Sequence, residues 1–472
     1  MPPTDYEESD IDAKPTTNKK RDRNKRRKYD VYYDNSTMKI GPSEIRENDD
    51  DDETTSLLLV QNGTKTIDDK YNYVFIIALI EGIGLLLPWN LFMCSKAYFI
   101  DYKLLPAGNA DYRINFLSYA GLASQIPNAI LNFLNLFTEK TGNANANGRI
   151  TASILIMSGL FGVTVAFAII DTTDFEETFF FITLVIIALI NMCTGVWGNC
   201  YFGIIAQFPS RFLNATMTGQ ISSGLITSIL MVVTKTGAPP RTAGIFFFIS
   251  AILVCLLCFI FYLSLPCSLY FRSMYKPKSN TTEERLSTYE GLPYMKTFKK
   301  TWYNLFDVWL LRVVSLALYP AILVEIEQCD PNFFIPSHLY SDVIYIMFSI
   351  CNITGGLMSF PFPKPSAKYM GLTVWLRLLA IPFFLLCNYR PGNRGNVPVV
   401  FFNDWLFWFV LIVYTVANGH AAGLTMVYAK QAAGEDKMMQ KTAGMMAAFA
   451  QSIGFVFAHM TTLICNYLLV NL

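Results

Sequence analysis

Charged residues are scarce in this chain, and histidines are scarcer. Asp, Glu, Lys and Arg make up 15% of the 472 residues, and there are three histidines. Soluble globular proteins contain roughly a quarter charged residues, so this composition argues against an ordinary water-soluble domain. The formal net charge of +1 gives no electrostatic reason to bind nucleic acid. Apolar residues dominate instead, at 53% of the total, as in a membrane protein.

The ten cysteines form neither a disulfide framework nor a metal site. They are scattered, most of them within apolar runs, including the one Cys-x-x-Cys spacing at Cys255 and Cys258. The three histidines lie far apart in sequence. No set of nucleophile, base and metal ligand converges, so we expect no cofactor, no metal and no enzyme activity.

A polar first segment precedes a series of long apolar runs. Residues 1–70 carry a basic block and an acidic block without apolar periodicity, which predicts a disordered cytosolic tail. A membrane helix needs about 20 apolar residues. Eleven runs of this kind lie near 73–99, 112–137, 150–170, 179–207, 213–234, 241–265, 303–326, 338–360, 368–388, 401–429 and 442–470. We predict an all-α polytopic membrane protein, with helices 1–6 in residues 71–265, a cytosolic loop at 266–301 and helices 7–11 in 302–472.

Lys and Arg are unevenly distributed among the connections. The connections after even-numbered helices hold fifteen of them and the opposite connections hold six. Because cytosolic loops carry the excess of Lys and Arg, the amino terminus and the 6–7 loop are predicted to be cytosolic and the carboxyl terminus outside. Six helices, a loop and five more is the layout of two bundles facing each other in an alternating-access transporter. The odd total argues against two intact copies of one six-helix unit.

The first apolar run contains an unusual stretch at residues 81–90, Glu-Gly-Ile-Gly-Leu-Leu-Leu-Pro-Trp-Asn. At about 100° per residue, Gly82, Leu86, Trp89 and Met93 fall on one face of a helix. The Gly-x-Gly-x-Leu-Leu-Pro-Trp-Asn pattern resembles the first-helix signature of the equilibrative nucleoside transporter family. The resemblance continues to the end of the chain, for example at Thr218-Gly219-Gln220, Tyr319-Pro320-Ala321 and Asn418-Gly419.

This resemblance implies an eleven-helix carrier of nucleosides or nucleobases with a fold related to the major facilitator architecture. It implies that Trp89 packs against the base, with Leu86, Asn90 and Met93 beside it. The implied hydrogen-bonding partners of base and sugar are four amides: Gln125, Asn128, Asn199 and Asn352.

The second apolar run carries a polar stripe. Its members recur at three- and four-residue spacing and are Ser118, Gly121, Gln125, Asn128, Asn132 and Asn135. Amides that faced lipid would be unsatisfied, so the stripe must face protein or water. Interhelical hydrogen bonds, worth about 0.6 kcal/mol each, explain one or two amides. Four in one line favour a water-filled cavity.

Three positions depart from the family pattern. Asn352 and Gly356 stand where the family carries an Asp and an Arg that hold the ribose. In helix four, Gly198 stands where the family has a Gln, although Asn199 is adjacent. A site without the charged pair holds ribose differently or holds another solute.

Six charged residues lie in or near the predicted helices and need partners, and one of them is Glu325. Glu81 replaces an apolar residue of the family motif well inside the first helix, and could be a proton-coupling group or attract a cationic solute. Asp342 starts only a few residues into helix eight, and so lies either in the membrane or at its interface. Structural ion pairing or an interfacial position accounts for Asp307, Arg312 and Arg377.

The sequence leaves two alternatives to a nucleoside carrier. One is a proton-linked or organic-cation carrier of the same fold, and the other is a non-transporting membrane receptor or scaffold. The tail segment from Glu53 to Leu57 and Leu58 fits an acidic dileucine pattern that sorting adaptors recognise. Matches of six residues often arise by chance. We therefore expect the protein in the plasma membrane, and an endolysosomal membrane is the alternative if the dileucine pattern is used.

Overall fold

The computed structural model describes residues 27–34, 37–44, 68–105, 111–114, 116–138, 144–235, 239–275, 293–361, 365–391, 394–395 and 397–471. The chain divides into two units, Met1–Asp68 and Asp69–Leu472. In the first unit, β1 (Arg27–Asp34) pairs antiparallel with β2 (Thr37–Glu44). Tyrosine and valine in β1 favour an extended strand, whereas the sequence predicted disorder here. The rest of the predicted tail and the dileucine segment lie outside the described residues.

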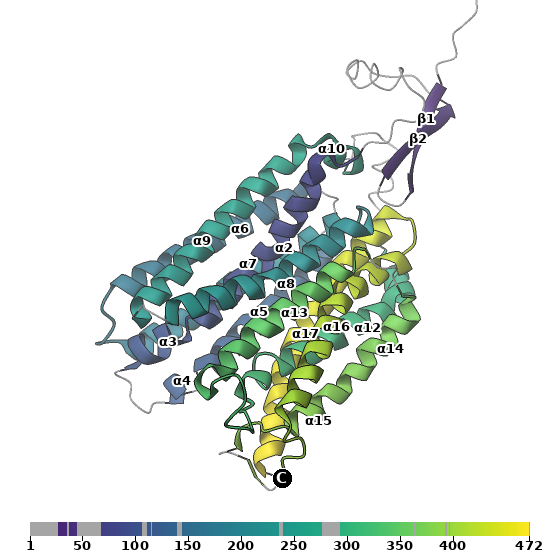
Figure 1. Cartoon of the computed structure of the whole chain (residues 1–472). Coiled ribbons are helices and arrows are strands. Elements are labelled where there is room, and N and C mark those ends of the chain that lie inside the picture. The colour runs from purple at the N-terminus through teal and green to yellow at the C-terminus, as the bar shows by residue number, and fades with distance from the viewer. Residues whose placement is uncertain are drawn as a thin grey trace, which may run out of the picture. The chain divides into compact units, whose positions relative to one another are not determined.

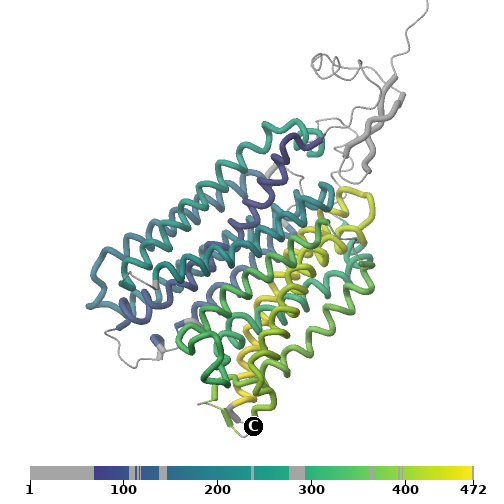
Figure 2. Tube along the Cα trace, in the orientation of Figure 1, coloured from purple at the N-terminus to yellow at the C-terminus, as the bar shows by residue number. Residues whose placement is uncertain are grey.

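The second unit consists of long helices (Figures 1 and 2). Ten of those described are long and apolar enough to cross a membrane, and α5 lies at the predicted second span. The long helices are α2 (Tyr73–Cys94), α5 (Phe116–Thr138), α6 (Ala144–Ile169), α7 (Glu176–Ile205), α8 (Ser210–Lys235), α9 (Pro240–Ser264), α12 (Tyr294–Leu318), α13 (Tyr340–Met358), α14 (Ala367–Leu376) with its continuation α15 (Ala380–Leu385), α16 (Asp404–Ala432) and α17 (Lys437–Asn471). The predicted all-α, eleven-helix membrane fold is confirmed.

Short helices occupy several connections. They are α3 (Lys96–Tyr98), α4 (Asp111–Ile114), α10 (Leu269–Met274) and the one-turn helices Lys70–Asn72, Phe99–Lys103, Leu265–Cys267, Leu323–Glu325, Ser337–Leu339 and Arg377–Leu379.

Helix α12 differs from its predicted bounds at both ends. It begins at Tyr294, inside the predicted loop, because its first turns carry exposed lysines that a count of apolar residues does not include. It ends at Leu318, ahead of Pro320, although the apolar run continues to 326. Proline disfavours a helical conformation in the residue before it, and Tyr319 is extended, with φ −116° and ψ 130°.

The helix packing repeats between the two halves of this unit. In the first half α2 packs on α8 and α5 packs on α7, and in the second half α12 packs on α17 and α13 packs on α16. The third pair of the first half, α6 and α9, has only α14 with α15 as its counterpart among the described helices. Four helices of each half therefore share one arrangement, although the odd helix count argued against complete copies.

Six helices join the halves, in two groups of contacts. Helix α17 packs against α5 and α7, and α8 packs against α13 and α16. In Figure 1, α2 to α9 lie on one side in purple to teal, and α12 to α17 lie on the other in green to yellow. A solute that crosses between the halves would pass beside these helices.

Glycines allow the closest helix contacts. A Cβ atom on Gly82 would lie 2.1 Å from the carbonyl oxygen of Thr216, and one on Gly219 would lie 2.0 Å from that of Leu79. Gly419 brings α16 against α13 in the same way. Small residues let membrane helices approach until their backbones touch, and this contact is a main source of helix association in lipid.

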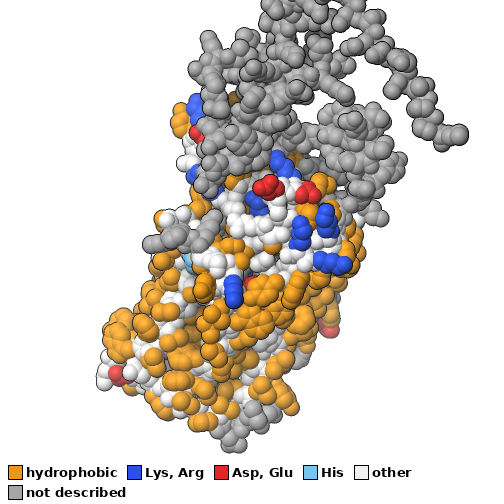
Figure 3. Space-filling model, turned by 90° about the vertical axis from the view of Figure 1, so that its right-hand side faces the viewer, with side chains coloured by type: hydrophobic (Ala, Val, Ile, Leu, Met, Phe, Trp, Pro, Cys, Tyr) orange, Lys and Arg blue, Asp and Glu red, His pale blue; other side chains and the backbone are white. Residues whose placement is uncertain are grey.

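The outer surface separates into an apolar band and a charged end. Exposed hydrophobic side chains such as Ile156 on α6 and Ile260 on α9 cover the outer helices. Figure 3 shows this hydrophobic band below a group of Lys and Arg side chains. We call the end of the bundle where α2 and α12 begin the basic end, because Arg211, Arg272, Lys296, Lys299, Lys300 and Lys368 lie there.

The glycine contacts give a matched test of the fold. We expect Gly219→Ala to cost about 1–3 kcal/mol, because the added methyl group overlaps the backbone of α2. Gly159→Ala on α6 adds the same methyl group where no atom lies within 4 Å, and should be neutral. Thermal unfolding in detergent compares the two variants. Equal melting temperatures would contradict the packing described here.

Candidate solute site between the two helical halves

The four predicted contact residues of α2 share an incompletely covered face. Leu86, Trp89, Asn90 and Met93 are all partly buried, whereas their neighbours Leu85, Leu87 and Leu91 are fully buried. The Asn90 side chain is oriented by α8, since its Nδ2 donates to Ser223 Oγ at 2.9 Å. The helix phase predicted from the sequence therefore places these side chains together, on the side of α2 that adjoins α8.

Glu81 points into the first half. Its side chain is fully buried, and Trp197 Nε1 on α7 donates to Glu81 Oε2 at 3.2 Å. Gly84 makes room for this arrangement, because a Cβ there would lie 2.6 Å from the Trp197 ring. Glu81 Oε1 has no hydrogen-bond partner among the described residues. The carboxyl group is thus enclosed by helices of one half, where a solute between the halves would not contact it.

The polar stripe of α5 faces protein, as its periodicity required. Asn128 Nδ2 donates to the carbonyl oxygen of Asn191 on α7 at 3.1 Å, and Asn132 Nδ2 donates to Ser452 Oγ on α17 at 2.8 Å. Gln125 is buried on the same face. The asparagines are therefore engaged in interhelical hydrogen bonds, the explanation that the sequence offered for only one or two of them.

Asn199 has no free amide atom in this conformation. Its Oδ1 accepts from Asn135 Nδ2 at 2.9 Å, and its Nδ2 donates to the carbonyl oxygen of Met445 on α17 at 3.1 Å. Arg149 completes this group by donating to Asn135 Oδ1 at 2.5 Å. The side chain of Asn199 is fully buried, so in this conformation it connects the halves and is not open to a solute.

Asn352 on α13 belongs to a polar chain within the second half. Asn418 Nδ2 on α16 donates to Asn352 Oδ1 at 3.1 Å, and Asn418 Oδ1 accepts from Arg377 at 2.6 Å and from Ser315 Oγ at 2.5 Å. Arg377 also donates to the carbonyl oxygen of Tyr414 at 3.1 Å. Arg377 is thus satisfied by neutral acceptors, where the sequence suggested ion pairing or an interfacial position.

The remaining α13 positions lie at different depths. Gly356 packs against Thr218 and Ile221 of α8, so α13 presents no cation there. Asp342 occupies the first turn of α13, at the end of the bundle opposite the basic end. That is the interfacial alternative that the sequence left open for this carboxylate.

Arg312 is a charged residue between the halves whose role the sequence did not reveal. It extends from α12 towards α8, where one of its amino groups donates to Met217 Sδ at 3.5 Å, and it lies 6.0 Å from the centre of the Phe455 ring on α17. Its Nε has no hydrogen-bond partner, and no carboxylate in the described part of the chain pairs with it. The ion pair suggested for Arg312 is therefore absent from the described residues.

Two glutamines lie one helical turn from the residues that Arg312 contacts. Gln220 follows Met217 on α8, and Gln451 precedes Phe455 on α17, so each lies on the same helix face as its neighbour. Gln451 Nε2 donates to Gln220 Oε1 at 3.3 Å across the two halves, while Gln451 Oε1 has no partner. We call Gln220, Arg312 and Gln451 the central polar cluster. The only signal for it in the sequence was an arginine inside a predicted span.

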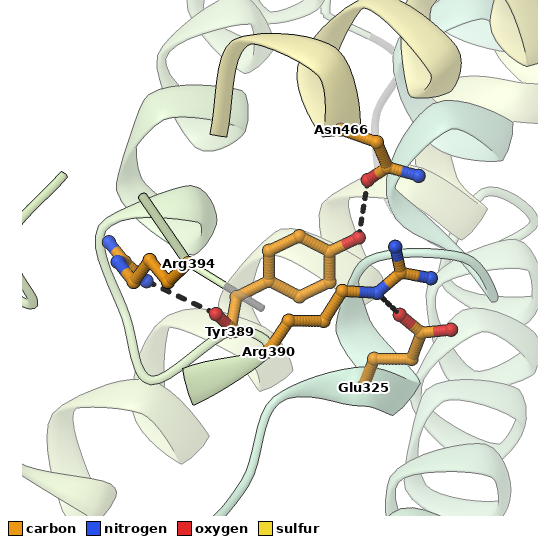
Figure 4. A network of polar contacts seen from close by, with 5 residues as sticks. All are labelled: Glu325, Tyr389, Arg390, Arg394 and Asn466. Carbon is orange, nitrogen blue, oxygen red and sulfur yellow. Dashed lines mark hydrogen bonds and ion pairs between the residues drawn. The ribbon is translucent and has the colours of Figure 1, made fainter. Parts of the chain in front are cut away.

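A separate polar network holds the loops opposite the basic end. Figure 4 shows Arg390 paired with Glu325, and Tyr389 Oη donates to Asn466 Oδ1 at 2.6 Å. The hydrogen bond to Glu325 raises the pKa of Arg390 above its usual value. Arg394 donates to five backbone carbonyl oxygens, between Leu385 and Pro398. A cavity of about 720 Å³ beside Glu325 opens here, within the second half.

No group of three or more His, Cys, Asp or Glu side chains that could hold a metal ion occurs in the part of the chain that the structure describes. The cysteines described are all free thiols. The site between the halves is thus built from aromatic, apolar and amide side chains and one guanidinium. Such a set binds and orients a polar organic molecule.

Comparisons with known proteins agree with this architecture. A sequence model of the nucleoside transporter family matches residues 184–291 and 273–465. Human equilibrative nucleoside transporter 2 is 26% identical, over 76% of this chain and 90% of its own length. Human equilibrative nucleoside transporter 1 is 25% identical, over 82% of this chain and 95% of its own length. Rat equilibrative nucleoside transporter 3 is also 25% identical, over 78% of this chain and 83% of its own length.

A solved structure supports the two-half fold. The major facilitator superfamily proton:xylose symporter XylE superposes with a TM-score of 0.55 over 83% of this chain and 88% of that protein. The sequence identity is 13%, so the likeness concerns the fold alone. The predicted major-facilitator-like arrangement is confirmed.

The environment of Glu81 predicts the effect of two substitutions. Glu81→Gln removes the charge but keeps an oxygen that can accept from Trp197 Nε1, so we expect a melting temperature close to that of the unmodified protein. Glu81→Leu leaves the buried indole N–H without an acceptor, which costs about 1–3 kcal/mol. Thermal unfolding in detergent gives the melting temperatures of both variants. A Leu variant as stable as the Gln variant would disprove a structural role for this hydrogen bond.

Proposed function

The chain belongs to the nucleoside transporter family, and we propose that it moves nucleosides across a membrane by facilitated diffusion, its two helical halves opening alternately to either side. The family match and the major-facilitator fold carry this proposal. The single structural observation that supports it best is the central polar cluster, which lies where α8 of the first half meets α12 and α17 of the second.

The contacts between the halves suggest how alternate opening proceeds. At the basic end, Asn199 bonds to Met445 and Asn214 Nδ2 donates to Ser359 Oγ at 2.5 Å. Towards the opposite end, Ser228 and Ser349 hydroxyl groups lie 3.1 Å apart. Each contact is a single hydrogen bond between small or amide groups, with a net value of about 0.5–1.5 kcal/mol. Either end can therefore separate while the other stays closed.

In the proposed site, aromatic and apolar side chains hold the base. Trp89 would stack or pack against it, and Leu86 and Met93 would flank it, since all three lie on the incompletely covered face of α2. The amides Gln125, Asn128, Asn199 and Asn352 remain candidates for binding base and sugar. In the present conformation Asn128, Asn199 and Asn352 are hydrogen-bonded to protein, so they would have to exchange these partners as the halves move.

A proton-linked or cation-selective mechanism has less support. Glu81, its proposed coupling group, is enclosed within the first half, and the charge between the halves is the cation Arg312. Asp342 lies at the helix end and not beside the central cluster. A scaffold without transport would need no such polar groups between its halves.

We further propose a location and an orientation. In this proposal the basic end and the amino terminus lie in the cytosol and the carboxyl terminus lies outside, and the excess of Lys and Arg at the basic end supports this orientation. The plasma membrane is the proposed location, and sorting to endolysosomes through Glu53, Leu57 and Leu58 is the alternative. Surface labelling of the unmodified chain and of a Leu57→Ala, Leu58→Ala variant distinguishes the two.

Uptake of labelled uridine and adenosine into cells lacking their own carriers tests the function. We expect saturable uptake that does not depend on a proton gradient, because no acidic side chain of the described residues adjoins the central cluster. Uptake should be compared at acidic and neutral pH, with and without Glu81→Gln. No saturable uptake by protein shown to be at the surface would refute the proposal.

Trp89→Ala tests the proposed base contact. We expect the KM for uridine to rise about tenfold, because stacking of a base on an aromatic ring contributes about 1–3 kcal/mol. Trp302→Ala is the control, since Trp302 lies 56% exposed at the basic end of α12, away from the site. Trp89→Ala protein at the surface with an unchanged KM would remove Trp89 from the site.

A further inference from the structure

Arg312 lies where a solute between the halves would have to pass. It lies in the last third of α12, and its neighbours are Met217 on α8 of the first half and Phe455 near the middle of α17. Gly454 allows α17 to approach, because a Cβ there would lie 2.8 Å from Arg312 Cβ. The guanidinium group therefore contacts both halves within the apolar, helical part of the bundle.

The surroundings of Arg312 compensate its charge only in part. A charged side chain inside a membrane helix is energetically costly, and such residues normally have a partner. Met217 supplies a thioether sulfur, which is a weak acceptor, and Phe455 supplies an aromatic face. Nε is excluded from solvent and has no partner.

Arg377 shows that this chain can satisfy a buried arginine fully. Arg377 donates to Asn418 Oδ1 at 2.6 Å and to the Tyr414 carbonyl oxygen at 3.1 Å, and it lies 5.0 Å from the centre of the Tyr414 ring. All of these partners belong to the second half. Arg312, which faces the other half, lacks any oxygen acceptor among the described residues.

Gln451 supplies the complementary unsatisfied group. Its Oε1 is buried without a partner, while its Nε2 is bonded to Gln220 on the opposite half. Phe455, which lies against the guanidinium, is one helical turn from Gln451. A free donor and a free acceptor thus lie on facing helices around the same point between the halves.

We propose that Arg312 is a solute-binding residue that selects uncharged, oxygen-bearing solutes and rejects organic cations. Its guanidinium donates hydrogen bonds to a carbonyl or hydroxyl oxygen of the solute, and Gln451 Oε1 accepts from a donor on the same solute. This inference rests on the proposed function, because it assigns a specificity residue to the same site. It makes α12, and not only α2 and α13, part of that site.

Kinetic analysis of two Arg312 variants tests the proposal. We expect Arg312→Gln to raise the KM for uridine about ten- to hundredfold, as for the loss of a hydrogen bond to a charged group, with little change in maximal rate per surface protein. Arg312→Lys keeps the charge without the planar fork and should recover part of the affinity. Arg272→Gln, on α10 at the basic end, is the matched control and should behave as the unmodified protein.

A cation supplies a readout that a merely structural role would not change. Tetraethylammonium should not inhibit uridine uptake by the unmodified protein, but should inhibit Arg312→Gln. If Arg312→Gln does not reach the surface, thermal unfolding of purified Arg312→Lys tests the proposal instead. Uridine should raise the melting temperature of Arg312→Lys by less than it raises that of the unmodified protein.

The outcomes separate the two proposals. If the unmodified protein at the surface takes up no nucleoside, the proposed function fails and this inference fails with it. If it transports uridine, and Arg312→Gln has an unchanged KM and stays insensitive to the cation, the inference alone is overturned. The same holds if uridine stabilises Arg312→Lys as strongly as it stabilises the unmodified protein.

Discussion

Lipid offers no hydrogen bonds, and the rest of this structure depends on that constraint. Every polar side chain in the apolar helices must find a partner in protein or water, because an unsatisfied polar group in hydrocarbon costs several kcal/mol. The side-chain NH2 groups of the α5 asparagines meet this demand by donating to α7 and α17, which fixes how these three helices are arranged. At Arg312, which lies between the halves, the demand is met only in part, and the proposed solute contact would supply the missing acceptor.

The sequence predicted the fold well because membrane helices are specified locally. Apolar runs of sufficient length located the helices, and helix phase grouped Leu86, Trp89 and Met93 on one face of α2. The α5 stripe also faced away from lipid, as expected. Periodicity, however, shows only which face needs partners and not which partners it has. Asn135 bonds to Asn199, which is 64 residues away in the sequence. Only the assembled fold determines that the partner of Asn135 is this amide and not water.

The central site was less predictable than the fold for the same reason. Arg312 was visible as a charge inside a span, but its lack of an acidic partner is a property of the assembled helices. Glu81 gave the opposite result, since its chemistry suggested a coupling group while the packing of Trp197 and Gly84 encloses it in one half. The helix count concealed the repeated packing of the two halves, because the repeat lies in which helices touch and not in how many there are.

The distribution of charged contacts between and within the halves bears on transport. Arg149 and Arg377 are bonded to asparagines within their own halves, and these bonds can persist as the halves move. Most bonds between the halves are neutral and weak. Charged groups make a few of them: Arg312 donates to the weak acceptor Met217 Sδ, and two lysines at the basic end donate to carbonyl oxygens. Lys430 on α16 donates to the carbonyl oxygen of Phe208 in the first half, and Lys437 on α17 donates to that of Met274 on α10 at 3.1 Å. Bonds to charged groups contribute about 1.5–3 kcal/mol, roughly twice a neutral bond. The basic end is therefore the more firmly closed of the two, and opening at the other end, where Ser228 and Ser349 meet, requires less free energy.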